Sequence, residues 1–290
     1  MLKYRLIFGI LMALFFTGMV ILGGYLDGSL TSSAADDKAI QGTLLCVLIG
    51  FLAIPAQLEM ASLVRNVGAK FFTPVAIVSS VLLATSWYFR QFADQPATFH
   101  LYYLLFATAF SVLALFAVQA HKFGTGGTIA NCSASLLSIF YLGFLSGFVL
   151  AVRIEFGVWP LLMFIATVKS SDTGAYIAGR IFGKHKFAPK ISPGKTWEGM
   201  AGAIGLAVIV ALIFAGYCGI MSRLAAVIFA VVFAVGGQLA DLVESMFKRD
   251  AKQKDSSSHV PGFGGILDVI DSPLGTAPAA YLFFMLVCNR

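Results

Sequence analysis

Charged residues are scarce in this sequence. Only 12% of the 290 residues are Asp, Glu, Lys or Arg, whereas 59% are hydrophobic. A soluble domain carries about twice that fraction of charge. The apolar residues occur in blocks of about 20 residues, which is the helix length needed to cross about 30 Å of hydrocarbon. The sequence therefore predicts an all-α integral membrane protein and excludes an ordinary soluble domain.

Several common signatures are also missing. The cysteines stand singly in apolar blocks, without a CxxC pair or a Cys/His cluster, so a zinc site and a disulfide framework both lack support. They are Cys46, Cys132, Cys218 and Cys288. The segment Gly194-Lys195-Thr196 is not a P-loop, because the upstream glycine spacing is absent. No small-x-small cleavage pattern follows the first apolar block, 6–26, so we predict a retained first helix and not a signal peptide.

The apolar blocks predict about nine transmembrane helices. They cover residues 6–26, 39–58, 71–90, 99–120, 129–152, 157–179, 199–221, 223–248 and 265–288. With the N-terminus in the cytoplasm, 14 of the 20 basic residues fall on the cytoplasmic side, and the positive-inside rule favours this orientation. The net charge of +6 then indicates anionic headgroups and phosphates as partners, and not nucleic acid. We expect a bacterial plasma (inner) membrane, because no eukaryotic targeting signal is present.

The two halves of the chain differ in chemical content. Residues 1–156 are hydrophobic helices with short loops, whereas eight of the 14 acidic residues lie between 165 and 275. A carboxylate at mid-bilayer costs about 2.5–3.5 kcal/mol on insertion scales, so such residues normally face a protein-lined cavity. We therefore predict a functional region, 157–290, whose helices form a polar cleft that faces the cytoplasm.

One apolar block carries a polar stripe. Asp241, Glu244, Ser245 and Lys248 stand at i, i+3, i+4 and i+7, which places them on one face of a helix that is otherwise Ala, Val, Phe, Ile and Gly. Such a stripe favours a water- or ligand-filled cleft. The alternative is a set of buried interhelical hydrogen bonds with one salt bridge.

The segment after this stripe is typical of phosphate binding. A basic cluster at the membrane surface contains Lys248, Arg249, Lys252 and Lys254. The Gly-rich turn 261–265, which includes Gly264 and Gly265, offers N–H groups that can hold phosphate oxygens. Asp268 and Asp271 follow at i and i+3 on the opening turn of the last helix, where the helix dipole favours anions.

Three carboxylates of this region suit a hard cation bound to a polyphosphate. Mg²⁺ prefers a few carboxylates together with phosphate oxygens, and Asp241, Asp268 and Asp271 supply the carboxylates. Such a cation stabilises charge on a phosphorus centre that undergoes in-line displacement. Each signal is weak alone, because i,i+3 Asp pairs often only cap helices. Their combination within 31 residues predicts a metal–phosphate site.

A second polar segment precedes it. Asp172, Tyr176 and Gly179 share one helical face, and the small residues around them allow another helix or a ligand to come close. The following loop, 191–199, combines a tight Ser-Pro-Gly turn with the cation of Lys195 and the interfacial Trp197. The alternative interpretation of this loop is ordinary positive-inside anchoring.

These two segments resemble the phosphatidate cytidylyltransferase (CDP-diacylglycerol synthase) family. The family motif Ser-x-x-Lys-Arg, Lys-Asp, Pro-Gly-His-Gly-Gly-x-x-Asp-Arg-x-Asp is matched in register between Ser245 and Asp271, and Asp-Thr-Gly-Ala-Tyr, Gly-Arg and Ser-Pro-x-Lys-Thr-Trp-Glu-Gly are matched between Asp172 and Gly199. The match covers about 110 residues closely. Two positions depart from the motif: Phe263 replaces the His and Val269 replaces the Arg, while His259 lies four residues upstream of Phe263.

The resemblance implies a function and a set of roles. It implies transfer of a cytidylyl group from CTP to phosphatidate, with Mg²⁺ as cofactor, in a homodimer, and it leaves open whether K⁺ joins Mg²⁺. The implied metal ligands are Asp241, Asp268 and Asp271, with Lys248 and Arg249 as the other catalytic groups. The implied substrate-binding residues are Asp172, Tyr176, Arg180, Ser192, Lys195, Ser245, Lys254, Gly264 and Gly265. The retained carboxylates and basic cluster predict that catalysis survives the departures at Phe263 and Val269.

Two alternatives stay open from the sequence. One is a CTP-dependent enzyme for another membrane lipid, such as an isoprenoid-ether phosphate or a polyprenol, because no residue pattern identifies the acyl chains. The other is a cation-coupled transporter with Asp241 and Asp268 as ion ligands. A transporter predicts broken helices in two related halves, which are not visible in the sequence, and the basic cluster would repel a cation.

Overall fold

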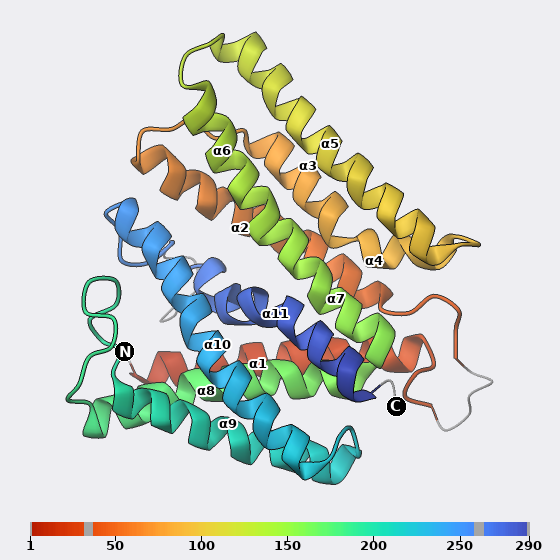
Figure 1. The fold of residues 1–290 in the computed structure, drawn as a ribbon, viewed down its shortest axis with the longest axis vertical. Coiled ribbons are helices and arrows are strands. Elements are labelled where there is room, and N and C mark those ends of the chain that lie inside the picture. Colours follow the sequence, from red (N-terminus) through yellow and green to blue (C-terminus); the bar gives the residue numbers. More distant parts are fainter. Residues whose placement is uncertain (1, 32–36, 258–263, 289–290) are drawn as a thin grey trace.

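The computed structural model describes residues 2–31, 37–257 and 264–288, and these residues form helices joined by short loops (Figure 1). Within those ranges there is no strand, and Lys186 and Thr196 form an isolated β-bridge. The helices are α1 (Leu2–Leu26), α2 (Thr43–Asn66), α3 (Thr73–Ala84), α4 (Ser86–Phe89), η2 (Arg90–Phe92), α5 (Pro96–Phe123), α6 (Thr128–Ser138), η3 (Ile139–Phe144), α7 (Leu145–Phe156), α8 (Val158–Phe182), α9 (Trp197–Cys218), α10 (Arg223–Asp250) and α11 (Leu267–Cys288).

The expected all-α membrane protein is confirmed. Among the described residues, seven helical segments are long and apolar enough to cross a membrane: Phe8–Leu26, Thr43–Asn66, Pro96–Phe123, Thr128–Phe156, Trp197–Cys218, Arg223–Asp250 and Leu267–Cys288. The predicted count of nine is not confirmed. Of the two remaining blocks, α3 has only 12 residues, and α8 carries Lys169-Ser-Ser-Asp172 in its middle.

The loops gather at two ends of the helical bundle. At one end, Arg153 pairs with Asp27 at 2.7 Å, and Gln91 exchanges hydrogen bonds with the backbone of Gln41. At the other, Arg249 Nε donates to the Ile191 carbonyl at 3.2 Å, which joins the α8–α9 loop to the last turn of α10. We call this second end the basic end, because the loops 183–196 and 250–257 hold its lysines.

Small residues set the closest helix contacts. A Cβ on Gly202 of α9 would lie 2.7 Å from the Gly174 carbonyl oxygen of α8, so these two helices meet almost backbone to backbone. This contact confirms the predicted role of the small residues around Asp172. A Cβ on Gly275 of α11 would lie 2.5 Å from Ala240 Cβ of α10. The second contact brings the polar faces of α10 and α11 together.

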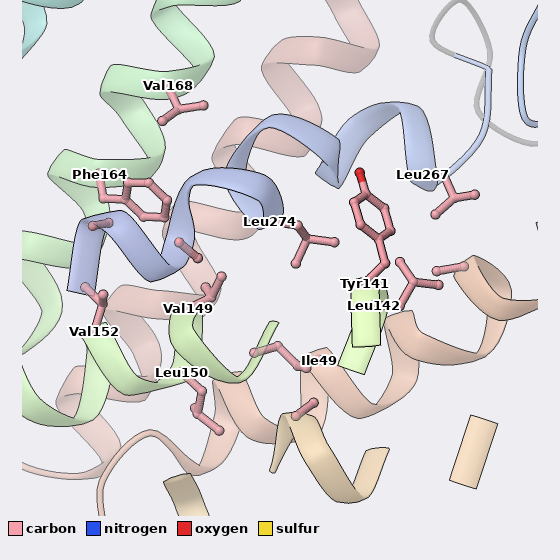
Figure 2. Packing of buried hydrophobic residues seen from close by; sticks show 14 of the residues in the cluster. Ile49, Tyr141, Leu142, Val149, Leu150, Val152, Phe164, Val168, Leu267 and Leu274 are labelled. Carbon is pink, nitrogen blue, oxygen red and sulfur yellow. The ribbon is translucent and has the colours of Figure 1, made fainter. Parts of the chain in front are cut away.

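Helix α11 runs through the interior of the bundle, against α7 on one side and α10 on the other (Figure 1). Its buried side chains, such as Leu267 and Leu274, pack among apolar residues of the surrounding helices (Figure 2). Helix α6, the π-helical segment η3 and helix α7 follow one another without a loop and form one long rod. Of these segments, α7 and η3 pack against α11.

Candidate active site

Three carboxylates converge where α10 meets α11. One carboxylate oxygen each from Asp241 and Glu244 of α10 and from Asp271 of α11 lie within 4.8 Å of one another. Glu244 and Asp271 are almost fully buried, at 1% and 4% exposure. The stripe predicted from sequence supplies the first two, and the close contact at Gly275 brings in the third. Carboxylates this close repel one another unless cations neutralise them.

Lysines from two helices and one loop provide this neutralisation. Lys195, from the α8–α9 loop, lies 2.6 Å from Asp241. Lys169 of α8 lies 3.2 Å from Asp172 and 3.9 Å from Asp271. Lys248 of α10 pairs with Glu244 one helical turn away. Each carboxylate of the group therefore has a lysine beside it.

Asp268 lies next to this group but has its own partners. Its Oδ1 accepts from Lys248 Nζ at 2.5 Å, and its Oδ2 accepts from the Gly265 N–H at 2.8 Å and from the Ser256 hydroxyl at 2.7 Å. Gly264 has φ +104°, a left-handed conformation that favours glycine, and a Cβ there would lie 2.6 Å from Asp268 Oδ2. The structure thus brings Asp241 and Asp271 together with Glu244, and connects Asp268 to them through Lys248.

Glu59 of α2 holds the N-terminus of α11 and was not predicted from sequence. Its carboxylate accepts from the Ile266 N–H at 2.9 Å and the Leu267 N–H at 3.0 Å, from the Ser257 hydroxyl, and from the Ser256 hydroxyl, which it shares with Asp268. A carboxylate at this position satisfies N–H groups that have no partner within the helix. Its one sequence signal is a carboxylate inside an apolar helix.

The α8–α9 loop is folded so that Lys195 points into the bundle. Glu198 accepts from the backbone N–H groups of Lys184 and His185 and from the His185 ring, which closes the loop on itself. Lys195 Nζ donates to the Gln238 carbonyl at 2.8 Å and to Gln238 Oε1 at 3.0 Å. Gln238 Nε2 in turn donates to Asp172 at 3.2 Å. This chain of contacts places Asp172 beside the carboxylate group.

The other predicted site residues lie around this centre or outside it. Tyr176 and Arg180 are exposed on α8, where Arg180 donates to the Tyr176 hydroxyl at 2.9 Å, so neither reaches the carboxylates. Ser245 is buried on α10, Ser192 is half-buried, and Arg249 and Lys254 are exposed at the basic end. Val269 is half-buried in the first turn of α11, while His259 and Phe263 lie outside the described residues.

The predicted substrate-binding residues therefore split into two sets. The first set is linked to the carboxylate group: Lys195 contacts Asp241, Asp172 is connected through Gln238, and Gly265 is connected through Asp268. The second set lies further out, as described above. Glu244 and Lys169, which were not predicted as ligands or substrate-binding groups, belong to the centre as well. Gln238 connects two of its members and carries no motif signal. Only the packing of α8, α10 and α11 shows that these residues meet.

Comparison with known proteins identifies the family to which the chain belongs. The model of the cytidylyltransferase family matches residues 3–287. The chain belongs to the cytidylyltransferase family. It is 29% identical over 288 residues to a phosphatidate cytidylyltransferase of Bacillus subtilis, which covers 98% of this chain and 97% of that relative. It is 32% identical over 240 residues to one of Staphylococcus epidermidis, covering 82% of this chain and 89% of the relative.

A third relative matches a more restricted part of the chain. A phosphatidate cytidylyltransferase of Haemophilus influenzae is 42% identical over 136 residues, which is 45% of this chain and 47% of that relative. Membership of the cytidylyltransferase family makes the chain a nucleotidyltransferase, so the resemblance inferred from the motifs is confirmed.

The residues present fit the divalent cation that the family suggests. Asp241, Glu244 and Asp271 offer hard oxygen ligands at one point, and Glu244 Oε1 accepts no hydrogen bond from a described residue. Lysines stand beside them, where anionic phosphates would need counter-charge. A centre with both charges suits a cytidylyltransferase, whose nucleotide substrate arrives as a polyanion.

Proposed function

We propose that this nucleotidyltransferase transfers the cytidylyl group of CTP to phosphatidate and releases CDP-diacylglycerol and pyrophosphate. The observation that carries the proposal is the carboxylate group Asp241, Glu244 and Asp271, set among lysines inside a membrane-embedded bundle. Relatives that align with most of the chain carry the name phosphatidate cytidylyltransferase, which supports the choice of lipid.

The reaction needs positioning more than acid–base chemistry. A phosphate oxygen of phosphatidate forms a bond to the α-phosphorus of CTP, and the bond from that phosphorus to the oxygen of the pyrophosphate group breaks. The nucleophile is already an anion, so no residue has to remove a proton from it. The protein has to hold two mutually repelling anions in line and neutralise the leaving group.

The buried carboxylates would hold the divalent cation. We propose Asp241, Glu244 and Asp271 as its ligands, with Mg²⁺ as the ion, because Mg²⁺ is bound by a few carboxylates together with substrate phosphates. When bound, the cation supplies charge neutralisation at the phosphates. One oxygen of Asp268 accepts three hydrogen bonds, and the other accepts from Lys248. We therefore propose that Asp268 positions Lys248 toward the site.

The lysines would hold the phosphates of the substrates. Lys169, Lys195 and Lys248 each pair with a different carboxylate of the group, so together they can contact several phosphates of a triphosphate. Arg249 and Lys254 at the basic end, with Arg180 on α8, would attract the anionic nucleotide and lipid headgroup toward this centre. Ser192 and Ser245, with the N–H groups of Gly264 and Gly265, would add hydrogen bonds to phosphate.

The orientation in the membrane follows from the same charges. We propose that the basic end and the N-terminus face the cytoplasm of a bacterial cell and that the segments of α3–α4 and α8 also cross the bilayer. A single cysteine introduced as Lys190→Cys should then react with an impermeant thiol reagent in inverted vesicles and not in intact cells. Reaction in intact cells would contradict the orientation. K⁺ beside Mg²⁺ and a homodimer remain proposals from the resemblance.

The reaction is tested with purified protein in detergent, labelled CTP and a series of lipid acceptors. We expect labelled CDP-diacylglycerol and stoichiometric pyrophosphate with phosphatidate and Mg²⁺, and no product after chelation with EDTA. A polyprenyl phosphate and an isoprenoid-ether phosphate serve as competing acceptors. Product from one of these and none from phosphatidate would overturn the lipid assignment but keep the nucleotidyl transfer.

A further inference from the structure

Tyr141 lies on an unusual segment of the rod that faces the candidate site. Residues Ile139–Phe144 form a π-helix between α6 and α7, and such segments are rare and frequently occur at functional sites. Buried hydrogen bonds hold the residue directly before the π-helical segment: Ser138 donates to Gln57 Oε1, and Gln57 Nε2 donates to Ser80, both at 2.6 Å. Tyr141 on this segment is therefore presented by a rigid frame.

The hydroxyl of Tyr141 is buried and points toward the first turns of α11. The residue is 8% exposed, and its ring packs edge-on against Phe247 of α10, with ring centroids 5.4 Å apart. Figure 2 shows the hydroxyl directed at α11 between Leu267 and Leu274. The carboxylates of Asp271, Glu244 and Asp241, which we propose as the cation site, are close enough for their charges to act on this hydroxyl.

This hydroxyl has no hydrogen-bond partner among the residues that the structure describes. Burial of an unpartnered hydroxyl costs free energy, and a phenylalanine would fill the same space without that cost. Oε1 of Glu244, which belongs to the same cluster, also lacks a hydrogen bond from the described residues, whereas Oε2 pairs with Lys248. Two unsatisfied polar groups that face one cluster indicate a bound species that can satisfy both.

We propose that Tyr141 is a positioning residue for the divalent cation and that its hydroxyl hydrogen-bonds to a water molecule in the cation's coordination shell. This inference rests on the proposed function. Mg²⁺ keeps several of its waters when it binds to proteins, and these waters need hydrogen-bond partners. Groups that contact a metal through its ligands set its affinity, and their loss typically costs about 10–100-fold. A residue of the N-terminal half would thus contribute directly to the site.

The test measures Mn²⁺ binding to the full-length protein in detergent, from the electron paramagnetic resonance signal of free Mn²⁺. We expect Tyr141→Phe to raise the Kd for Mn²⁺ about 10-fold. The matched control is Tyr103→Phe, which removes another buried hydroxyl, on α5 beside Phe89 and Phe99, and should leave the Kd unchanged. Thermal unfolding in EDTA provides the second readout, in which Tyr141→Phe should be at least as stable as the wild type.

The outcomes separate this inference from the proposed function. If the wild type binds Mn²⁺ and forms CDP-diacylglycerol while Tyr141→Phe binds Mn²⁺ within two-fold of the wild type, the role of Tyr141 is overturned and the function stands. If the wild type neither binds Mn²⁺ nor forms product, both fail. Weaker binding together with a lowered melting temperature in EDTA would assign Tyr141 a structural role and also overturn the inference.

Discussion

Lys195 shows how a single side chain joins the parts of the site. It comes from a loop, yet its side chain is only 10% exposed and contacts both Asp241 and Gln238 on α10. A positive charge held in this way can transfer from a carboxylate to a phosphate when the nucleotide binds. Its contribution should therefore appear in nucleotide affinity and not in cation affinity.

We expect Lys195→Met to raise the KM for CTP about 10–100-fold, because a hydrogen bond to a charged group contributes about 1.5–3 kcal/mol. The Kd for Mn²⁺ should not rise, since the substitution removes a cation that competes for Asp241. Lys190→Met, an exposed lysine of the same loop, is the control and should leave the KM within about two-fold. Steady-state kinetics with varied CTP measures the effect. An unchanged KM would refute the role of Lys195.

At the scale of helices, the site depends on contacts that lie outside it. Glu59 belongs to α2, but its carboxylate accepts hydrogen bonds from the backbone of Ile266 and Leu267, more than 200 residues away in the chain. The start of α11 also carries Asp268 and Asp271, so α2 sets the position of the acidic residues. The N-terminal half is therefore part of the catalytic structure.

Replacing the Glu59 carboxylate should loosen the start of α11. We expect Glu59→Gln to lower the free energy of unfolding by about 1.5–3 kcal/mol, because the amide leaves fewer acceptors for the buried N–H groups. Glu155→Gln, which removes a more exposed pair with Arg90, should change it by less than about 1 kcal/mol. Thermal unfolding in detergent compares the two. Equal losses of unfolding free energy in the two variants would show that the α2–α11 contact stabilises the protein no more than the exposed ion pair does.

The α8–α9 contact gives a second prediction at this scale. Gly202→Ala places a methyl group 2.7 Å from the Gly174 carbonyl oxygen, so we expect a loss of about 1–3 kcal/mol of stability. Gly205→Ala lies on the same helix with open space around the new Cβ, and there the higher helix propensity of alanine should stabilise by up to about 1 kcal/mol. Opposite signs in thermal unfolding are predicted. A stabilised Gly202→Ala would contradict the close packing.

Part of this arrangement could be predicted from the sequence, and the missing part has a physical reason. The helices and the polar face of Asp241 and Glu244 follow from apolar block length and i,i+3 spacing, which are local properties. Glu59 and Tyr141 could not be assigned, because their roles depend on contacts between segments far apart in the chain. The position of Asp268 depends on Ser256 and Gly265, whose conformation local spacing does not determine.

At the scale of the whole molecule, a buried ion pair fixes the end of the bundle opposite the site. Asp27, after α1, pairs with Arg153 of α7 and accepts from the Gly42 N–H at 3.0 Å. Burial alone would raise the pKa of Asp27, but the Gly42 N–H, the Ser29 hydroxyl and the Arg153 guanidinium outweigh it and hold the pKa below its usual range. The folded protein thus binds this proton less tightly than the unfolded chain.

The sign of the pH dependence follows from that lowered pKa. The contribution of Asp27 is fully present above the ordinary aspartate pKa of about 4 and is lost as the pH falls through the lower folded value. Asp27→Asn should therefore be less stable by about 3 kcal/mol at pH 7, and its difference from the wild type should shrink only below about pH 4. Melting temperatures of both proteins at pH 7, 5, 4 and 3 test this. A constant difference would show that Asp27 does not titrate as described.

The central claim is that nucleotidyl transfer takes place at the carboxylate group on α10 and α11. The most direct test is the rate of CDP-diacylglycerol formation from CTP and phosphatidate by the wild type, by Asp271→Asn and by Asp250→Asn, an exposed carboxylate at the end of α10. We predict that Asp271→Asn loses at least about 100-fold in rate while remaining folded, and that Asp250→Asn keeps the wild-type rate. A folded Asp271→Asn with a rate close to that of the wild type would contradict the account.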